Sequence, residues 1–302
     1  MRRKIRRYDA FVRLWIAKVQ CTGRHEEGAE YARLQLYHAR SSFSGGILIR
    51  LDRRDRVAYI FIERNVARNA MSLAMWHELR ALVGEVAATN GIRALVVTGT
   101  RDAFVAGADL SDFRAFRDAN DGLAYEALVE ETLQAIEALP FATVAAIAGS
   151  CTGAGVIVAC ACDVRFGARN AKVGIPIART VGNVTTAANL ARVAAVVGSA
   201  RVTAWLLGAE LDDAELALAS GFFYELCDTP EMLAARAAAF AERTARNAPL
   251  TIASAKELFR RARANAANVA DRDLLERCYG SDDFREGVAA FLAKRPAEFT
   301  GR

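Results

Sequence analysis

The chain has 302 residues, 53% of them hydrophobic and 25% charged, which is the composition of an ordinary globular protein. Its net charge of +5 arises in residues 1–45, where ten Lys/Arg and four Asp/Glu give +6 and leave the remainder near neutral. The body of the chain therefore lacks a basic footprint for nucleic acid, and no apolar run reaches the roughly 18 residues of a membrane span.

The basic segment, residues 1–45, is predicted to be a poorly ordered extension. Five cations among the first seven residues precede an apolar stretch at residues 11–16, a pattern that also fits a transit peptide or an interfacial helix. Three glutamates between residues 26 and 30 argue against a transit peptide. Since termini tolerate additions, a dispensable extension is the favoured interpretation.

The cysteines and histidines point away from metal and hydrolase chemistry. Cys160 and Cys162 form a C-x-C pair, but no second pair or histidine cluster completes a zinc site. The six cysteines are expected to be reduced thiols of a cytoplasmic protein. Of three histidines, two lie in the extension and His77 lies in a helical pattern, so a Ser-His-Asp or Cys-His hydrolase is disfavoured.

Regular patterning begins at residue 47. Residues 47–50 and 57–62 are predicted strands joined by a charged turn at residues 52–55. Ser72 is expected to cap a helix that ends near residue 88. A buried strand at residues 93–98, a helix at 123–139 halted by Pro140, and a strand at 143–148 follow.

The second half is predicted to be increasingly helical. A helix at residues 153–162 leads to short strands near Val164 and Val173, and Ser199 is expected to cap another helix. Residues 212–220 form a helix stopped by Gly221, residues 222–226 a last strand, and three or four helices occupy residues 230–292. The alternation predicts an α/β core more complex than a simple doubly wound sheet.

Two glycine-rich turns at predicted strand–helix junctions carry the chemistry. They are Ala-Phe-Val-Ala-Gly-Ala-Asp-Leu at residues 103–110 and Gly-Ser-Cys-Thr-Gly-Ala-Gly at residues 149–155. Each is expected to present backbone N–H groups at a helix N-terminus, where the dipole favours negative charge. Two such donors aimed at one point form an oxyanion hole that holds a thioester carbonyl as it becomes an enolate. Small residues at such junctions also serve tight packing, and neither turn fits a dinucleotide or P-loop pattern.

In order and spacing, the motifs resemble the crotonase (enoyl-CoA hydratase/isomerase) superfamily. The segments that carry the resemblance are residues 63–72, 103–110, 144–149, 153–155, 161–163, 211–222 and 284–296. The resemblance implies a crotonase-like spiral of ββα units, with an acyl-CoA-binding core at residues 46–228. It also implies a helical oligomerisation region at residues 229–302 and a homotrimer or homohexamer.

The resemblance assigns the oxyanion donors to the backbone N–H groups of Ala108 and Ala154. The substrate-binding positions that it implies are Val66, Ala67, Asn69, Ala106, Gly107, Asp109, Leu110, Gly153, Ile157, Ile177 and Lys294. Lys294 would approach the CoA phosphates, from a neighbouring subunit in one arrangement. Coenzyme A enters as part of the substrate, and no other cofactor and no metal is expected.

The chain departs from the family at the two hydratase glutamates. The resemblance places these at Ile157 and at Ile177, or at Ala178 if the alignment shifts by one residue. Hydration needs a base to activate water and an acid to protonate carbon, and each such group is worth about 10²–10⁴-fold in rate. The expected activity is therefore acyl-CoA binding with enolate stabilisation, in fatty-acid or aromatic-acid breakdown.

Other groups could replace the missing pair. Asp112 and Glu130 are candidate acid/base residues. Each also has a structural interpretation, because an aspartate near a helix start commonly caps that helix and a glutamate on the outer face of a helix is usually solvated. Arg179 is a candidate for binding a carboxylate on the acyl group, or for a salt bridge. The alternatives are thus a decarboxylase, a double-bond isomerase, or a catalytically silent acyl-CoA-binding subunit.

Overall fold

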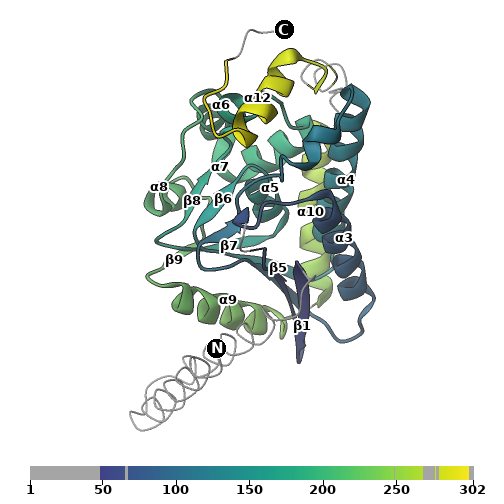
Figure 1. Cartoon of the computed structure of the whole chain (residues 1–302). Coiled ribbons are helices and arrows are strands. Elements are labelled where there is room, and N and C mark those ends of the chain that lie inside the picture. The colour runs from purple at the N-terminus through teal and green to yellow at the C-terminus, as the bar shows by residue number, and fades with distance from the viewer. Residues whose placement is uncertain (1–47, 65–66, 248, 268–275, 277–278, 299–302) are drawn as a thin grey trace, which may run out of the picture.

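The computed structural model describes residues 48–64, 67–247, 249–267, 276 and 279–298, without the side chains of 262 and 264–267. The predicted N-terminal extension lies outside these residues. Within them, the chain forms two sheets whose strands alternate along the sequence from residue 94 onward. Each pair of strands is followed by a helix, which is the predicted spiral of ββα units (Figure 1).

The larger sheet has six strands in the order β1–β2–β3–β5–β7–β9. Their bounds are Ile49–Arg54, Val57–Ile62, Ala94–Thr98, Ala142–Ile147, Val164–Ala168 and Glu225–Cys227. The hairpin β1–β2 is antiparallel and every other neighbour is parallel. The predicted turn at residues 52–55 is too early, because β1 pairs through Arg54 opposite Val57 and Asp55 alone takes a positive φ of 49°.

The smaller sheet is parallel and contains β4 (Ala103–Val105), β6 (Ser150–Thr152) and β8 (Lys172–Gly174). Each of its strands follows a strand of the larger sheet along the chain, so it collects the loop regions at one end of the larger sheet. The two glycine-rich turns both leave this smaller sheet.

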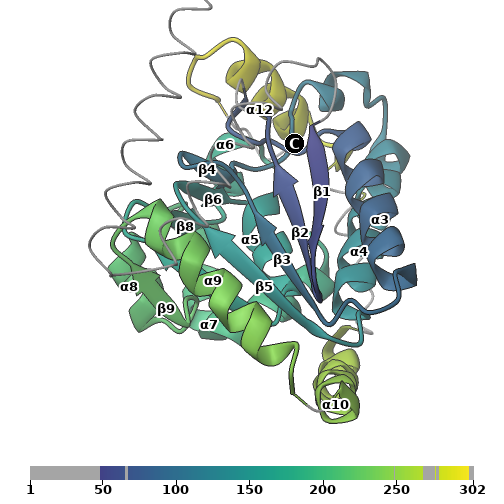
Figure 2. The ribbon, with the colours of Figure 1, turned by 90° about the horizontal axis from the view of Figure 1, so that it is seen from below.

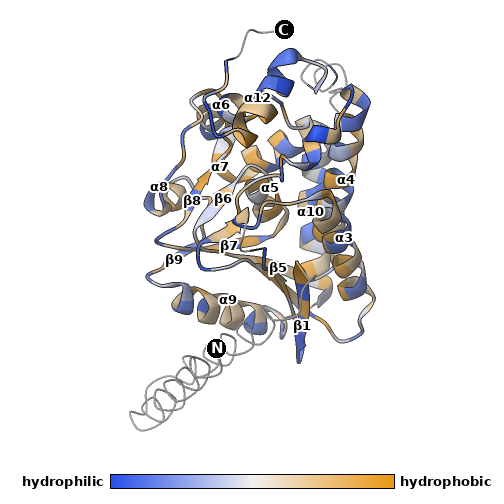
Figure 3. Cartoon of the chain, viewed as in Figure 1, coloured by the Kyte–Doolittle hydropathy of each residue, from blue (hydrophilic) through white to orange (hydrophobic). Residues whose placement is uncertain are grey.

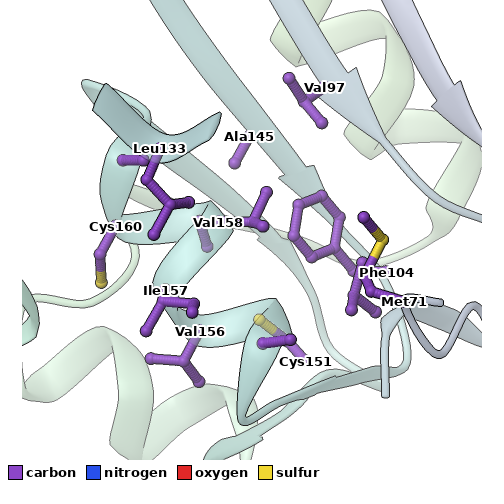
Figure 4. Packing of buried hydrophobic residues seen from close by; sticks show 14 of the residues in the cluster. Met71, Val97, Phe104, Leu133, Ala145, Cys151, Val156, Ile157, Val158 and Cys160 are labelled. Carbon is purple, nitrogen blue, oxygen red and sulfur yellow. The ribbon is translucent and has the colours of Figure 1, made fainter. Parts of the chain in front are cut away.

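The helices of the first half agree with the predicted caps. Ser72 caps α3 (Leu73–Ala88), with its hydroxyl accepting from the Met75 N–H. The helix α4 (Ala119–Glu137) begins four residues before its predicted start because Asp118 caps it. All eight residues of α5 (Ala154–Ala161) are buried, and Figure 4 shows Val156, Ile157 and Val158 within the core.

The middle of the chain contains α6 (Ile177–Thr180), α7 (Ala187–Leu207) and α8 (Ala214–Ala219). The predicted helix start at Ser199 is only the second half of α7, which breaks at Gly198, where φ is 77°. The first half begins at the cap Thr186 and was missed. Gly221 follows α8 with φ of 79°, as expected of a residue that ends a helix.

By length and composition, α7 is the one helix in the described part of the chain that is apolar enough to cross a membrane. However, its break at Gly198 interrupts the backbone ladder that a span requires. Its Arg192 is buried and pairs with Glu130 and Glu137 of α4. These contacts hold α7 against α4 within the described fold.

Three helices of the predicted C-terminal region are described: α9 (Pro230–Thr244), α10 (Pro249–Ala267) and α12 (Asp282–Leu292). Figure 2 shows α9 lying across the face of the large sheet opposite α3, α4 and α5. The strand β2 is buried on both faces because Ala58, Ile60 and Ile62 face one hydrophobic cluster while Val57, Tyr59 and Phe61 face the other. The hydrophobic strands and the mostly hydrophilic outer side of α9 are visible in Figure 3.

Candidate active site

A cavity of about 320 Å³ lies where the smaller sheet, α4, α5 and α12 meet. It is lined by both glycine-rich turns, by α4, by the segment around α6, and by Phe291 of α12. Its lining residues are Arg68, Ala106, Gly107, Ala108, Leu110, Phe113, Tyr125, Glu126, Val129, Ser150, Thr152, Gly153, Ala154, Ile157, Ile175, Pro176, Ile177, Arg179, Thr180, Val181, Asn183, Thr185, Leu211 and Phe291.

The two glycine-rich turns lie against each other on the cavity wall. Gly107 and Gly153 have φ of 109° and 51°, a region that glycine enters without steric penalty. A Cβ added to Gly153 would lie 3.7 Å from the Gly107 Cα, so the turns are in van der Waals contact. Gly155 is needed for a different reason, because a Cβ there would lie 2.2 Å from the Val105 carbonyl oxygen.

The amides of Ala108 and Ala154 lie on this wall with their hydrogen-bonding capacity unused. The first turn pairs with Met71 through the Gly107 carbonyl and the Asp109 N–H, at 2.9 and 2.8 Å. This pairing leaves the Ala108 N–H between them. Ala154 is the first residue of α5, where an N–H has no intrahelical acceptor. Within the described residues, neither N–H donates to a protein acceptor.

The helix expected directly after the first turn is absent, which corrects that prediction. A short 3₁₀ helix, η2 (Asp112–Ala115), follows instead. Only Ala154 therefore lies at the N-terminus of an α-helix, where the dipole adds to the N–H group. Ala108 would act through its amide alone.

Apolar side chains cover the cavity wall beside Ala154. Ile157, one turn along α5, is 7% exposed, and Ile177 at the start of α6 lines the same cavity. Leu110, Val129 and Ile175 line it as well. These side chains exclude water and neither accept nor donate protons.

One carboxylate does line the cavity, although it is not one of the two acid/base candidates chosen from the sequence. Among the described lining residues, Glu126 of α4 is the only Asp or Glu, and its side chain is 5% exposed. Tyr279 donates its hydroxyl to Glu126 Oε1 at 2.7 Å, and Asn183 Nδ2 donates to the same hydroxyl oxygen at 3.2 Å. Burial, followed by the nearby Glu126 charge, raises the pKa of Tyr279 well above its usual value, so Tyr279 remains a donor.

A signal for Glu126 was present in the helical periodicity. Residues 122, 126, 129, 133 and 136 are all buried on one face of α4, which is the spacing of an inward face. The general rule that glutamates on this helix are solvated is therefore wrong for Glu126.

The two predicted acid/base residues have structural partners outside the cavity. Asp112 Oδ2 accepts from the backbone N–H of Leu73 at 2.6 Å, so it serves the start of α3. Glu130 accepts from Arg192 at 2.9 and 3.1 Å. Neither residue lines the cavity, and each carboxylate is held by a long-range contact that the sequence pattern does not reveal.

Asn69 and Asp109 hold the first turn in place. Asn69, which the resemblance places along the CoA, is 0% exposed and does not line the cavity. Its Nδ2 donates to the carbonyl oxygens of Ala103 and Phe104 at 2.7 and 3.1 Å. Asp109 pairs with Arg64 at 2.5 Å, and although burial raises its pKa, hydrogen bonds from Ser111 and Arg64 lower it overall.

The other predicted contacts divide into two groups. Ala106, Gly107, Leu110, Gly153, Ile157 and Ile177 line the cavity. Ala67 and Lys294 do not, and Val66 lies outside the described residues. Lys294 is exposed, three residues beyond the cavity-lining Phe291. Arg179 lines the cavity with an exposed side chain.

The cysteines in the described part of the chain are inert thiols. Cys151, Cys160, Cys162 and Cys227 are free and buried. Burial raises the pKa of Cys160 to about 11 and that of Cys162 to about 12. A thiolate is the reactive form of cysteine, so these residues are not nucleophiles at neutral pH.

Comparisons with known proteins identify the family. The enoyl-CoA hydratase/isomerase family matches residues 52–302. A probable enoyl-CoA hydratase of Rhodobacter capsulatus is 36% identical over 264 residues, covering 84% of this chain and 98% of the relative. A second probable enoyl-CoA hydratase, from Mycobacterium bovis, is 33% identical and covers 84% of this chain and 100% of its own length.

Solved structures resemble the chain in the same way. The crystal structure of an enoyl-CoA hydratase/carnithine racemase from Magnetospirillum magneticum is 31% identical, covers 86% of this chain and 98% of its own, and has a TM-score of 0.69. A methylmalonyl-CoA decarboxylase has a TM-score of 0.76, with 85% and 99% coverage, but at 22% identity this likeness concerns the fold alone. On these matches and its ββα architecture, the chain belongs to the enoyl-CoA hydratase/isomerase family, the crotonase superfamily.

Proposed function

We propose that this protein binds an acyl-CoA thioester and polarises its carbonyl oxygen with the backbone N–H groups of Ala108 and Ala154. The observation that carries the proposal is the presence of two amides without an acceptor on the wall of one cavity. Donors already in place at the position where charge develops stabilise an enolate without reorganisation. The acyl chain would occupy the apolar space beside Leu110, Val129 and Ile157.

The proposal includes slow hydration. Ile157 and Ile177 lie where the family resemblance expects the two hydratase glutamates, and both line the cavity. An isoleucine cannot activate water or return a proton to carbon. The decarboxylase, the double-bond isomerase and the silent acyl-CoA-binding subunit therefore remain the alternatives, within a cytoplasmic homotrimer or homohexamer.

The test removes the N–H donor of Ala154 and leaves unchanged the side chains that the chemistry needs. Ala154→Pro removes the N–H at the first position of α5, where proline is well tolerated in helices. Bound cinnamoyl-CoA reports the effect, because donors that draw electrons onto its carbonyl shift its ultraviolet band to longer wavelength. We expect the shift in the wild type and its loss in Ala154→Pro.

The matched control is Ala119→Pro, at the first position of α4, which does not line the cavity. It is expected to keep the spectral shift. A wild-type complex without any shift would contradict the oxyanion proposal, and absence of acyl-CoA binding by calorimetry would contradict the proposed function as a whole. Crotonyl-CoA hydration is expected to run about 10²-fold or more below that of a glutamate-bearing relative.

A further inference from the structure

On the α4 side of the cavity, hydrogen bonds join three polar side chains, those of Glu126, Tyr279 and Asn183. Glu126 is 5% exposed and shares the cavity with both Ala108 and Ala154. Tyr279 has one hydroxyl proton and gives it to Glu126, so it must accept from Asn183, which supplies the amide proton at 3.2 Å. This one-directional chain fixes the orientation of the glutamate.

The helix α4 has a glycine where the Tyr279 ring packs against it. Gly122 lies one helical turn before Glu126, and a Cβ there would be 2.2 Å from the Tyr279 Cγ. The tyrosine ring therefore lies directly on the helix backbone, and from there its hydroxyl reaches Glu126. A residue with a side chain at position 122 would displace the ring.

We propose that Glu126 is the proton-transfer residue of this cavity, with Tyr279 as its positioning residue, and that the substrate class is a β,γ-unsaturated acyl-CoA thioester. The inference rests on the proposed function, because the enolate needs the amides of Ala108 and Ala154. The inferred reaction is isomerisation, in which the double bond moves into conjugation with the thioester.

The reaction balances with one carboxylate. The α-carbon C–H bond breaks and its proton passes to a Glu126 carboxylate oxygen. The electron pair forms the enolate double bond, and the negative charge develops on the thioester oxygen beside the two amides. The carbonyl then re-forms, the double bond shifts to the α,β position, and the γ-carbon takes the proton back from Glu126. No water, oxidant or co-reactant is consumed.

The same arrangement disfavours the two other reactions. Hydration requires separate groups to activate water and to protonate carbon, whereas the described cavity wall holds a single carboxylate. Decarboxylation requires a second carboxylate, on the substrate, in the same cavity as Glu126. Two like charges in one poorly solvated site disfavour each other.

The experiment follows trans-3-hexenoyl-CoA by the ultraviolet absorbance of the conjugated product, together with deuterium uptake from D₂O by mass spectrometry. Glu126→Gln keeps the shape and removes the base, so the turnover number is expected to fall about 10²–10⁴-fold with substrate affinity nearly unchanged. Tyr279→Phe is expected to lower the turnover number less, with KM unchanged, and Glu126→Asp to retain part of the rate.

The matched control is Glu131→Gln on the same helix, where Glu131 is exposed and pairs with Arg80 on the surface. It is expected to behave as the wild type. Acyl-CoA binding without isomerisation or deuterium uptake in the wild type overturns the inference while leaving the proposed function intact. Full activity in Glu126→Gln, or an equal loss in Glu131→Gln, overturns it as well. Failure to bind acyl-CoA overturns the proposed function itself.

Discussion

Gly122 lies in the interior of α4. Apart from proline, glycine has the lowest helix propensity of all residues. It lowers helix stability by about 1 kcal/mol relative to alanine. In this protein the missing side chain makes room for the Tyr279 ring, which lies against the helix backbone. A single glycine therefore couples α4 to a tyrosine that lies 157 residues further along the chain.

Replacing this glycine tests the coupling. Gly122→Ala is expected to lower the free energy of unfolding by about 1–3 kcal/mol, because the new methyl group overlaps the ring. In a Tyr279→Ala background the same change is expected to be neutral or to stabilise by up to about 1 kcal/mol, since only helix propensity remains. Urea unfolding of the two single variants and the double variant measures the difference. Equal effects in both backgrounds would refute the contact.

At the scale of the element, the segment between β2 and α3 is held by one side chain. Asn69 takes a φ of 58°, which asparagine adopts more readily than most residues. Its Oδ1 accepts from the Arg64 N–H at 2.7 Å, while its Nδ2 donates to two carbonyls at β4. The loop and the strand that carries the first glycine-rich turn are thus joined inside the protein.

Removal of this side chain is expected to destabilise the fold. Asn69→Ala leaves three buried backbone groups without this partner and places alanine at a positive φ, so we expect a loss of about 3 kcal/mol. The control Asn120→Ala, at an exposed position near the start of α4, is expected to change stability by less than about 0.5 kcal/mol. The two urea midpoints provide the comparison, and similar midpoints would show that the Asn69 bonds contribute little.

For the whole molecule, apolar side chains remain exposed on the C-terminal helices. On α10, Leu250, Leu258 and Phe259 are 81%, 66% and 78% exposed. Large apolar side chains left exposed on one helix fit an interaction surface. The proposed homotrimer or homohexamer gives them a partner, namely another copy of this chain.

Light scattering is expected to give a mass three or six times that of the 32.7 kDa chain. Phe259→Asp is expected to shift the mass toward the monomer, because a charge would be buried in the interface. Ala81→Asp, on the exposed face of α3, provides the control and is expected to leave the mass unchanged. A monomeric wild type at micromolar concentration would contradict the assembly.

The sequence by itself determined the features that depend on neighbouring residues. Ser72 caps a helix and Gly221 ends one through contacts within a few positions. The glycine-rich turns present Ala108 and Ala154 because positive φ angles and an N-terminal helix residue are local properties. The motif order therefore predicted the family and the oxyanion candidates before any contact was known.

Tertiary structure alone decided which polar side chains serve the cavity. Asp112 faces the start of α3, Glu130 faces Arg192, and Glu126 faces the cavity, although all three are acidic residues within 19 positions. The role of a carboxylate depends on the groups around it, and Glu126 meets Tyr279 across 153 residues. Such a contact exists only once α4 and the C-terminal segment pack together, because no periodicity within either segment specifies its partner.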